Sequence, residues 1–435
     1  MLRRLAAGVS AALLVASCSS GEPAVSSSST AATTTAVATT SSTTTAPTTS
    51  TTEPSTTSTA PAPLVLPPAL GRDEIPWEQV GPGWYVVLYD SSLAVMDPDT
   101  YRDGPVGLYL VDREGRRYLV ATWPADDHPQ AIVDAVGTSV LVSGRPSMDD
   151  PFQVEWIDLI TGERRMAGTA DFPMRDLSQA LFPRLVLPAG EAVTVYGSDG
   201  TTEWLERRSW DGDSLGVFFR QAYVESLSDL RWFDRPDGAA VIVLHRDGVT
   251  EVTPSGEILR DLWAPAETIC YPVRWWDADT YLAACYGQAP GAAPLDDYGN
   301  LHTYYGRLWL LETDGLAGAP LTAFPADPPF VGDYGYRDAW PAGTETLVQW
   351  SGDCGALAIR VLQPDGSGGT FAIETPGQVE GKELIDVIDG VIAVFGWEGC
   401  DGWARSLFTV DLAGHLVRDL FPSVEDARGL ATIYP

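Results

Sequence analysis

The sequence predicts an all-β fold, a seven-bladed β-propeller of four-stranded antiparallel blades that follows a signal peptide and a disordered Ser/Thr-rich stalk. The first observation behind this prediction is a short hairpin, in which two apolar runs flank a polar turn that contains glycine. It recurs along the chain, and its turn glycines are Gly115, Gly162, Gly212, Gly256, Gly315, Gly366 and Gly414. Their spacing of about fifty residues is typical of propeller blades.

The second observation is a further pair of β-rich runs upstream of each glycine hairpin. The second strand of this pair is Trp84 to Tyr89 in the first repeat and Val391 to Phe395 in the last. Such apolar and aromatic runs are expected where a strand is covered on both faces by neighbouring blades. Two strands in this pair and two in the hairpin make a four-stranded blade. Helical periodicity is not sustained, except around Met174 to Leu181.

A closed ring needs one more strand contact, because an open array leaves an exposed edge at each end. Two segments could supply the contact. Leu430 to Tyr434 stands where an eighth repeat would begin and could pair with the first blade, and Leu64 to Leu66 could add to the last blade. We favour the C-terminal segment.

The N-terminus indicates export. Residues 1–18 have two arginines, a short apolar run and small residues before Cys18, which is the pattern of a secretory signal. The apolar run is too short to span a bilayer. The last four residues, Val15 to Cys18, resemble the lipobox of bacterial lipoproteins. This resemblance implies cleavage before Cys18 and diacylation of its thiol. The alternative is ordinary secretion without the anchor.

Residues 19–70 are predicted to be a disordered linker rich in Ser, Thr and Pro, and residues 71–435 to form the propeller domain. Such a tract cannot bury enough apolar surface to offset the entropy of ordering.

The charge excludes one class of partner. The full chain has a net charge of -32, its one lysine is Lys382, and its arginines are scattered among carboxylates. Binding to nucleic acid requires clusters of Lys and Arg, so we expect no nucleic-acid partner. We expect a monomer that meets the membrane through its lipid anchor alone.

Four cysteines follow Cys18. Because export brings the protein into an oxidising compartment, we expect these cysteines to form two disulfides. Cys354 and Cys400 each come just after the second strand of successive repeats, where equivalent loops lie side by side. We therefore expect Cys354 to pair with Cys400. This leaves Cys270 to pair with Cys285 across the first two strands of the fifth repeat.

One segment resembles a known family. Leu230 to Val243 contains a Pro-Asp-Gly turn, ending at Gly238, before a hydrophobic strand, as in TolB-like and WD40-like propellers. The Gly-His and Trp-Asp marks of true WD40 repeats are absent, so the resemblance implies architecture and assigns no functional residue. With the lipobox and the stalk, the chain resembles a surface propeller lipoprotein of a high-GC Gram-positive bacterium. This implies a location on the outer face of the cytoplasmic membrane.

Motifs for catalysis or cofactor binding are not evident. The four histidines lie far apart without ligand-type spacing, and no nucleophile elbow, zinc-protease motif or phosphate loop is present. We therefore expect no metal and no cofactor. Asp97 to Gly104 could be a calcium loop, but its spacing departs from the helix-loop-helix pattern, and a polar turn is the preferred interpretation.

Aromatic and acidic residues gather near the loops that join second to third strands. In propellers these loops share one end of the ring with the blade-to-blade connections, and Tyr suits recognition because it offers a flat apolar face and a hydroxyl. The predicted binding residues are Tyr286, Asp296, Asp297, Tyr298, Tyr304, Tyr305, Trp397 and Trp403.

The leading interpretation is a binding module for an envelope protein, a peptide or a cell-wall glycan. The alternative is a hydrolase or lyase that acts on extracellular polysaccharide through paired carboxylates. A third is a scaffold of an envelope assembly. Three or more Asp, Glu or Arg side chains that converge on the mouth of the central channel would favour the enzyme, and an apolar aromatic patch on the loop face would favour binding or scaffolding.

Overall fold

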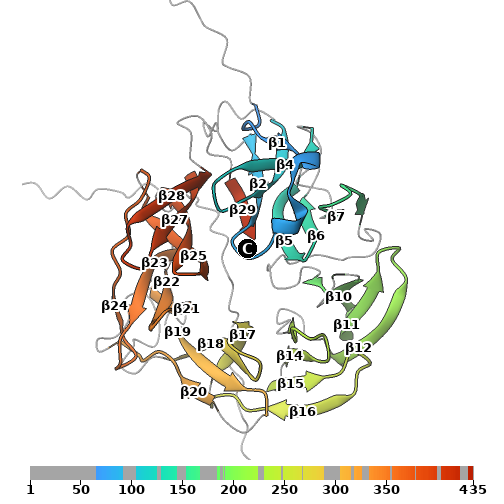
Figure 1. Ribbon diagram of the computed structural model, residues 1–435. Coiled ribbons are helices and arrows are strands. Elements are labelled where there is room, and N and C mark those ends of the chain that lie inside the picture. The colour runs from blue at the N-terminus through green and yellow to red at the C-terminus, as the bar shows by residue number, and fades with distance from the viewer. Residues whose placement is uncertain are drawn as a thin grey trace, which may run out of the picture. The chain divides into compact units, whose positions relative to one another are not determined.

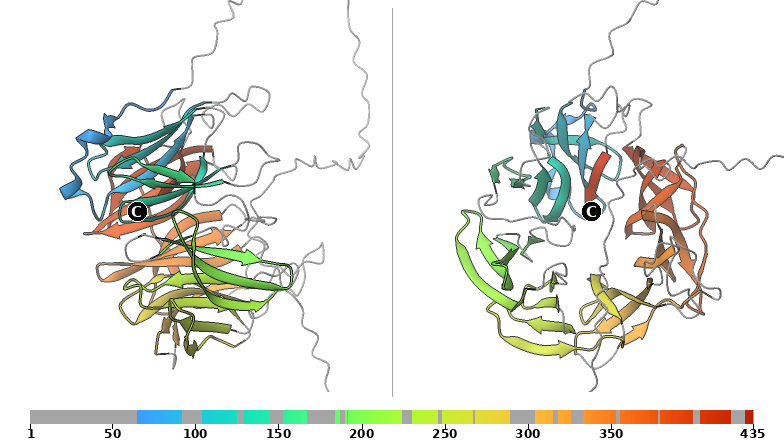
Figure 2. Two further views of the ribbon diagram at one scale, coloured as in Figure 1. Left: turned by 90° about the vertical axis from the view of Figure 1, so that its right-hand side faces the viewer. Right: turned by 180° about the vertical axis from the view of Figure 1, so that it is seen from behind.

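The computed structural model describes most of the chain from Val65 onwards. The described residues are 65–91, 104–124, 129–144, 153–166, 184–186, 190, 192–223, 230–245, 248–266, 268–288, 304–314, 318–325, 333–352, 355–377, 379–398, 403–421 and 430–434. Their strands form six sheets, which Figure 1 shows following one another around a common centre in chain order. The same arrangement is seen from behind in Figure 2. Within these ranges, no helix is long and apolar enough to cross a membrane.

The first sheet contains both the beginning and the end of the propeller. Its strand order is β29–β2–β3–β4–β1, and β1 is parallel to β4 while the other neighbours are antiparallel. Two 3-10 helices connect β1 to β2. The elements are β1 (Leu70–Gly71), η1 (Arg72–Glu74), η2 (Trp77–Gln79), β2 (Tyr85–Asp90), β3 (Val106–Val111), β4 (Arg117–Trp123) and β29 (Leu430–Tyr434).

Three four-stranded antiparallel sheets follow, each built from strands that are consecutive in the chain. The second sheet contains β5 (Pro129–Val136), β6 (Ser139–Gly144), β7 (Gln153–Asp158) and β8 (Arg164–Met166). The third contains β9 (Arg184–Leu185), β10 (Ala192–Ser198), β11 (Thr202–Ser209) and β12 (Ser214–Ala222). The fourth contains β13 (Arg231–Asp234), β14 (Val241–His245), β15 (Gly248–Val252) and β16 (Ile258–Leu262).

The next sheet has eight strands because two antiparallel runs are joined by one parallel pairing, that of Gly306 with Gly335. The first run contains β17 (Ile269–Trp275), β18 (Thr280–Gln288), β19 (Tyr304–Glu312) and β20 (Gly318–Pro320). The second contains β21 (Asp333–Ala342), β22 (Glu345–Gly352), β23 (Gly355–Leu362) and β24 (Gly368–Thr370). The last sheet contains β25 (Gly381–Ile388), β26 (Val391–Glu398), β27 (Trp403–Asp411) and β28 (Leu416–Phe421).

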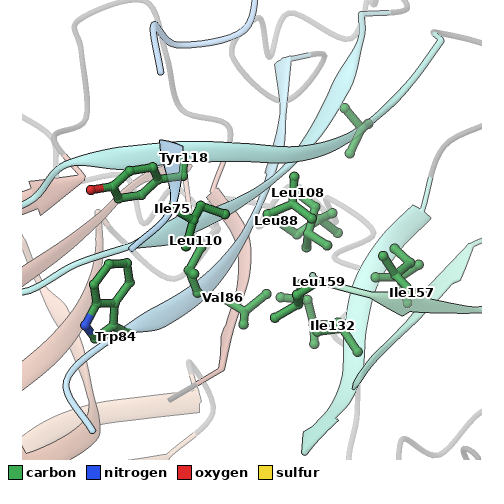
Figure 3. Close-up of a cluster of buried hydrophobic side chains, with 14 of the residues drawn as sticks. Ile75, Trp84, Val86, Leu88, Leu108, Leu110, Tyr118, Ile132, Ile157 and Leu159 are labelled. Carbon is green, nitrogen blue, oxygen red and sulfur yellow. The ribbon is translucent and has the colours of Figure 1, made fainter. Parts of the chain in front are cut away.

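The core lies between successive sheets. Each cluster of buried apolar side chains joins one four-stranded run to the next, as Val86 and Leu88 of the first sheet meet Ile132 of the second in Figure 3. The same holds between β17–β20 and β21–β24, where Leu282 and Ala284 meet Tyr336. Both faces of the middle strands are therefore covered, as the apolar runs predicted, and β2, β3 and β6 are buried along their whole length.

The ring is closed by the C-terminal strand. β29 pairs antiparallel with β2, with Val87 opposite Ile433 and Leu88 opposite Thr432. A buried cluster between the first and last sheets adds to this closure, where Val87 and Val111 meet Leu407. The favoured prediction for ring closure is confirmed. The other segment forms no strand over its described residues, Val65 and Leu66, but Leu66 packs against the same cluster.

The recurring hairpin glycine has a physical reason. In the described turns this glycine has a positive φ, for example +81° at Gly366 and +86° at Gly414, a conformation that disfavours residues with a Cβ. Several of these turns also press against the preceding sheet. A Cβ on Gly366 would lie 2.8 Å from the Ala323 nitrogen, and one on Gly414 would overlap the Ala372 carbonyl oxygen. Both glycine carbonyls accept hydrogen bonds from the preceding run, at 2.7 Å and 2.8 Å.

The predicted β-propeller class is thus confirmed, with four-stranded antiparallel sheets as its units. The number of blades stays a prediction, because strands of the fifth and sixth predicted repeats share one sheet. Gly315, the turn glycine of the fifth repeat, lies outside the described residues.

We expect Gly414→Ala to destabilise the protein more than Gly212→Ala. Both glycines have a positive φ near 85°, so each substitution costs about 1 to 2 kcal/mol from the backbone alone. A Cβ on Gly212 meets no described atom within 4 Å, whereas the Cβ on Gly414 overlaps the preceding sheet. Overpacking adds about 1 to 3 kcal/mol there. Urea denaturation measures the free energy of unfolding of both variants. An equal loss in the two variants would show that the preceding sheet shifts to accommodate the added Cβ at no cost.

Candidate functional site

The innermost strands of several sheets carry a charged residue at an equivalent position. The antiparallel register shifts just before Asp134 in β5, Arg274 in β17, Asp338 in β21 and Asp386 in β25. A β-bulge re-aims the side chains next to it. Because these strands are the first of their sheets, they lie nearest the common centre (Figure 1). The bulges therefore set a series of polar side chains along the inner side of the ring.

Arg274 and Asp338 join two neighbouring runs. Arg274 Nε donates to Asp338 Oδ1 at 2.9 Å, and Arg274 Nη2 donates to Asp338 Oδ2. Asp338 Oδ1 also accepts from the Ala339 backbone N–H at 2.7 Å. The Arg274 guanidinium lies over the ring of Trp340, 3.2 Å from its centroid. The planar fork of arginine thus holds the carboxylate with two hydrogen bonds, the geometry in which such pairs are strongest.

Gln349 makes the next connection. It lies opposite Asp338 in the register of β21 with β22 and is 1% exposed. Its Nε2 donates to the Lys382 carbonyl at 2.9 Å, and its Oε1 accepts from the Leu384 N–H at 2.8 Å. One buried amide therefore satisfies a donor and an acceptor on the inner strand of the last sheet, where an unpaired buried group would be costly.

Two further carboxylates complete the set. Arg337 Nη2 donates to Glu383 Oε1, and these side chains are 30% and 37% exposed. Asp386 is buried and accepts from the Val387 N–H at 2.8 Å. We call these residues the inner-strand polar cluster, which consists of Arg274, Arg337, Asp338, Gln349, Glu383 and Asp386.

Burial and charge oppose each other in this cluster. Burial raises the pKa of the Asp338 carboxyl, and the guanidiniums of Arg274 and Arg337 act against that shift. Burial likewise raises the pKa of the Asp386 carboxyl, against the guanidiniums of Arg274 and Arg113. The half-exposed Arg337 and Glu383 leave hydrogen-bonding capacity for a ligand at the inner side of the ring.

The predicted binding residues that the structure describes with their side chains lie in strands. Tyr305, at 1% exposure, packs edge-on against Tyr336 and Trp350. Tyr286 contacts Tyr271 edge-on at 5.7 Å between ring centroids, and burial raises the pKa of its hydroxyl. Trp397 is 8% exposed. All three contribute to packing.

The other predicted binding residues are described in part or not at all. Tyr304 and Trp403 belong to β19 and β27, but their side chains lie outside the described set. Asp296, Asp297 and Tyr298 lie outside it altogether. A binding role for the predicted residues therefore stays a prediction.

The structure contains a disulfide between Cys270 and Cys285, which face each other across β17 and β18. This is the pairing that the repeat register predicted for the fifth repeat. Cys354 and Cys400 lie outside the described residues, so their pairing stays a prediction, as does the nature of the Asp97 to Asp103 segment.

Two of the four histidines are described, and each has a local partner. His245 Nε2 is 2.6 Å from Thr250 Oγ1, and His415 Nδ1 is 3.3 Å from Asp411 Oδ2 within the last hairpin. Both contacts are local to one hairpin or strand pair.

Sequence reasoning missed the inner-strand polar cluster. We interpreted the first strand of each repeat by its aromatic residues and overlooked the charged one. A signal was present, because Asp134, Asp338 and Asp386 are each followed by a small or branched apolar residue shortly before the turn to the second strand. The sequence could not show which residues pair in this cluster, because the partners come from neighbouring repeats.

Comparisons with known proteins place the chain by fold alone. No protein-family model matches it, and no curated protein matches it. Among solved structures it is similar to a prolyl endopeptidase at 12% identity and a TM-score of 0.46, over 72% of this chain and 45% of that one. It thus spans less than half of that enzyme's length.

Two further solved structures are similar to the chain, and the description of the first names a β-propeller domain. The β-propeller domain of the Trilobed protease from Pyrococcus furiosus is 12% identical with a TM-score of 0.43, over 78% of this chain and 94% of that one. TolB from Acinetobacter baumannii is 13% identical with a TM-score of 0.37, over 65% and 62%. The sheet order and the packing of successive sheets define this chain as a β-propeller module.

We expect Asp338→Asn to lower the free energy of unfolding by about 1.5 to 3 kcal/mol, because it replaces a carboxylate that accepts two hydrogen bonds from Arg274. Urea denaturation at neutral pH measures this change. Glu345→Gln is the matched control, since Glu345 is an exposed acid in the adjacent strand β22, and it should change stability by less than about 0.5 kcal/mol. An unchanged stability for Asp338→Asn would contradict a joining role for the pair.

Proposed function

We propose that the chain is a lipid-anchored, extracytoplasmic β-propeller that binds an envelope protein, a peptide or a cell-wall glycan. The observation that carries this proposal is the pairing inside the inner-strand polar cluster. Asp338 is held by Arg274, and Glu383 by Arg337. A carboxylate engaged by a guanidinium is poorly placed to exchange protons with a substrate, whereas a half-exposed ion pair can still exchange hydrogen bonds with a ligand.

The anchor and the linker support the same function. The lipobox-like residues before Cys18 imply attachment to the outer face of the cytoplasmic membrane, and the Ser/Thr-rich sequence between Cys18 and Val65 has the composition of a tether. A propeller closed by β29 is a rigid support, and rigid supports position variable loops for binding. The module works as a monomer and needs no cofactor.

A second candidate function is favoured by one observation. More than three Asp, Glu and Arg side chains converge on the inner strands β17, β21 and β25, as an enzyme that acts on extracellular polysaccharide would require. Burial raises the pKa of both Asp338 and Asp386, a property of general acids. Release of reducing ends from purified wall polysaccharide by the wild type, abolished in the folded Asp386→Asn variant, would favour this hydrolase or lyase over the binding module.

For binding, we expect the loop between β18 and β19 to supply contacts. Gln288 pairs with Tyr304, so an Asn-Gly turn in place of residues 289–303 should close the hairpin and leave the circular dichroism and melting temperature unchanged. Sedimentation with purified cell-wall polysaccharide and capture from envelope extract measure the effect. We expect at least about a tenfold loss of whichever interaction the wild type makes. If the altered protein captures the same amount of ligand, the loop between β18 and β19 is not the binding site. The other loops at the same end of the propeller then become the candidates.

For the anchor, we expect Cys18→Ser to release the protein from membranes or to leave its signal uncleaved, because the lipid is attached to the thiol. Membrane fractionation and the mass of the mature protein measure this. The Cys270→Ser variant, which alters a cysteine of the propeller, is the control and should stay with the membrane. Equal retention of the Cys18→Ser protein would contradict lipid anchoring.

A further inference from the structure

A polar hollow lies beside the first sheet, at the end opposite to the loop between β2 and β3. It has a volume of about 350 Å³ and is formed by the segment after η2 and by the turn between β3 and β4. The lining residues that matter below are Gln79, Trp84, Arg113, Glu114 and Arg116. The volume is at the lower end of the range for small-molecule sites.

Arg113 fixes one wall of this hollow. Its Nε and Nη2 donate to the Pro82 carbonyl at 3.0 Å and 2.6 Å, and its Nη1 donates to Asp389 in the last sheet at 3.3 Å. Gly83 has a φ of +84°, and a Cβ there would lie 2.5 Å from Arg113 Nε. The glycine therefore permits the close approach that holds the guanidinium against the segment after η2.

Arg116 also lines the hollow and keeps one free donor. Its Nε donates to Asp112 Oδ2 at 2.5 Å, while Asp112 Oδ1 accepts from the backbone N–H groups of Glu114 and Arg116. Asp112 is fully buried, so the turn and the guanidinium are held in place together. The Arg116 side chain is 53% exposed, and its Nη2 donates to Glu114 Oε2 at 3.3 Å. Within the described part of the chain, Nη1 has no hydrogen-bond partner.

Trp84 adds a further donor. Its ring stacks on Tyr118 at 5.7 Å between centroids and is 8% exposed. Figure 3 shows its indole nitrogen on the side of the ring that points away from Val86 and Leu110. This N–H makes no hydrogen bond to the residues that the structure describes, and Trp84 lines the hollow.

We propose that this hollow binds the carboxylate of a sugar acid the size of a monosaccharide. The carboxylate accepts a charge-assisted hydrogen bond from Arg116 Nη1 and a second bond from the Trp84 indole N–H. The Gln79 amide, which also lines the hollow, accepts a hydrogen bond from a ring hydroxyl, and so does the Glu114 oxygen that Arg116 does not engage. This site goes beyond the proposed function, because it lies at the opposite end of the strands from the loop between β18 and β19.

The ligand specificity is tested by calorimetric titration of the full mature chain with three probes. Glucuronate should bind, and glucose, which has a hydroxymethyl group in place of the carboxylate, should bind at least about tenfold more weakly. Equal binding of glucose would overturn the carboxylate assignment. Alanyl-alanine carries a carboxylate without a sugar ring, and tighter binding of this dipeptide than of glucuronate would overturn the sugar assignment.

The residues are tested by two variants and a control. Trp84→Phe keeps the stacking on Tyr118 and removes the N–H, and Arg116→Met removes the charge. Each should weaken glucuronate binding about tenfold. Trp84→Phe should keep the melting temperature near that of the wild type, whereas Arg116→Met should lower it because the buried Asp112 loses its ion pair, so binding is measured well below both melting temperatures. Arg117→Met is the control. The Arg117 guanidinium lies over the Phe421 ring instead, so its removal should leave glucuronate binding unchanged. Wild-type affinity in Arg116→Met would overturn the proposal.

Discussion

The pairing of β29 with β2 is the constraint on which the rest of the structure depends. Each sheet is covered by its two neighbours, so the first and last sheets would expose an apolar face if the ring stayed open. β29 adds a strand to the first sheet from the far end of the chain, and the cluster around Val87 and Leu407 is then buried. The bond from Arg113 to Asp389, which forms part of the hollow, spans the same junction between the first and last sheets.

Two kinds of contact recur at several junctions of this ring and join a sheet to its neighbour. On the outside, the turn glycine presses on the preceding sheet and gives it a carbonyl acceptor, as Gly366 does for Ala323. On the inside, a bulge turns a polar side chain toward the neighbouring inner strand, as with Asp338 and Arg274. Apolar packing between the sheets is not directional, so these polar contacts at the two ends of the interface select the orientation in which the sheets meet.

The sequence could predict what is local to one repeat. The positive φ of the turn requires glycine, and burial of a strand on both faces requires an apolar run. The closing strand Leu430 to Tyr434 could be predicted from its position after the last repeat. The ends of the strands could not be located, because the apolar and aromatic pattern continues past them. Tyr305 and Trp397 were therefore assigned to loops, whereas β19 begins at Tyr304 and β26 extends to Glu398. The inner-strand polar cluster depends on a bulge and on residues from neighbouring repeats, and neither can be read from one strand.

The scarcity of cations gives the arginines a common role. The chain has 27 Lys and Arg against 59 Asp and Glu. Several arginines nevertheless bond an acid of a neighbouring strand run, and these pairs are Arg113–Asp389, Arg165–Asp211, Arg207–Asp234, Arg274–Asp338 and Arg337–Glu383. Arginines that join sheets are already neutralised, so they contribute little to attracting an acidic ligand. Arg116 differs, because both of its acid partners, Asp112 and Glu114, lie in its own turn. An anionic ligand would therefore have the remaining Nη1 donor of this guanidinium available to it, on a surface that is otherwise acidic.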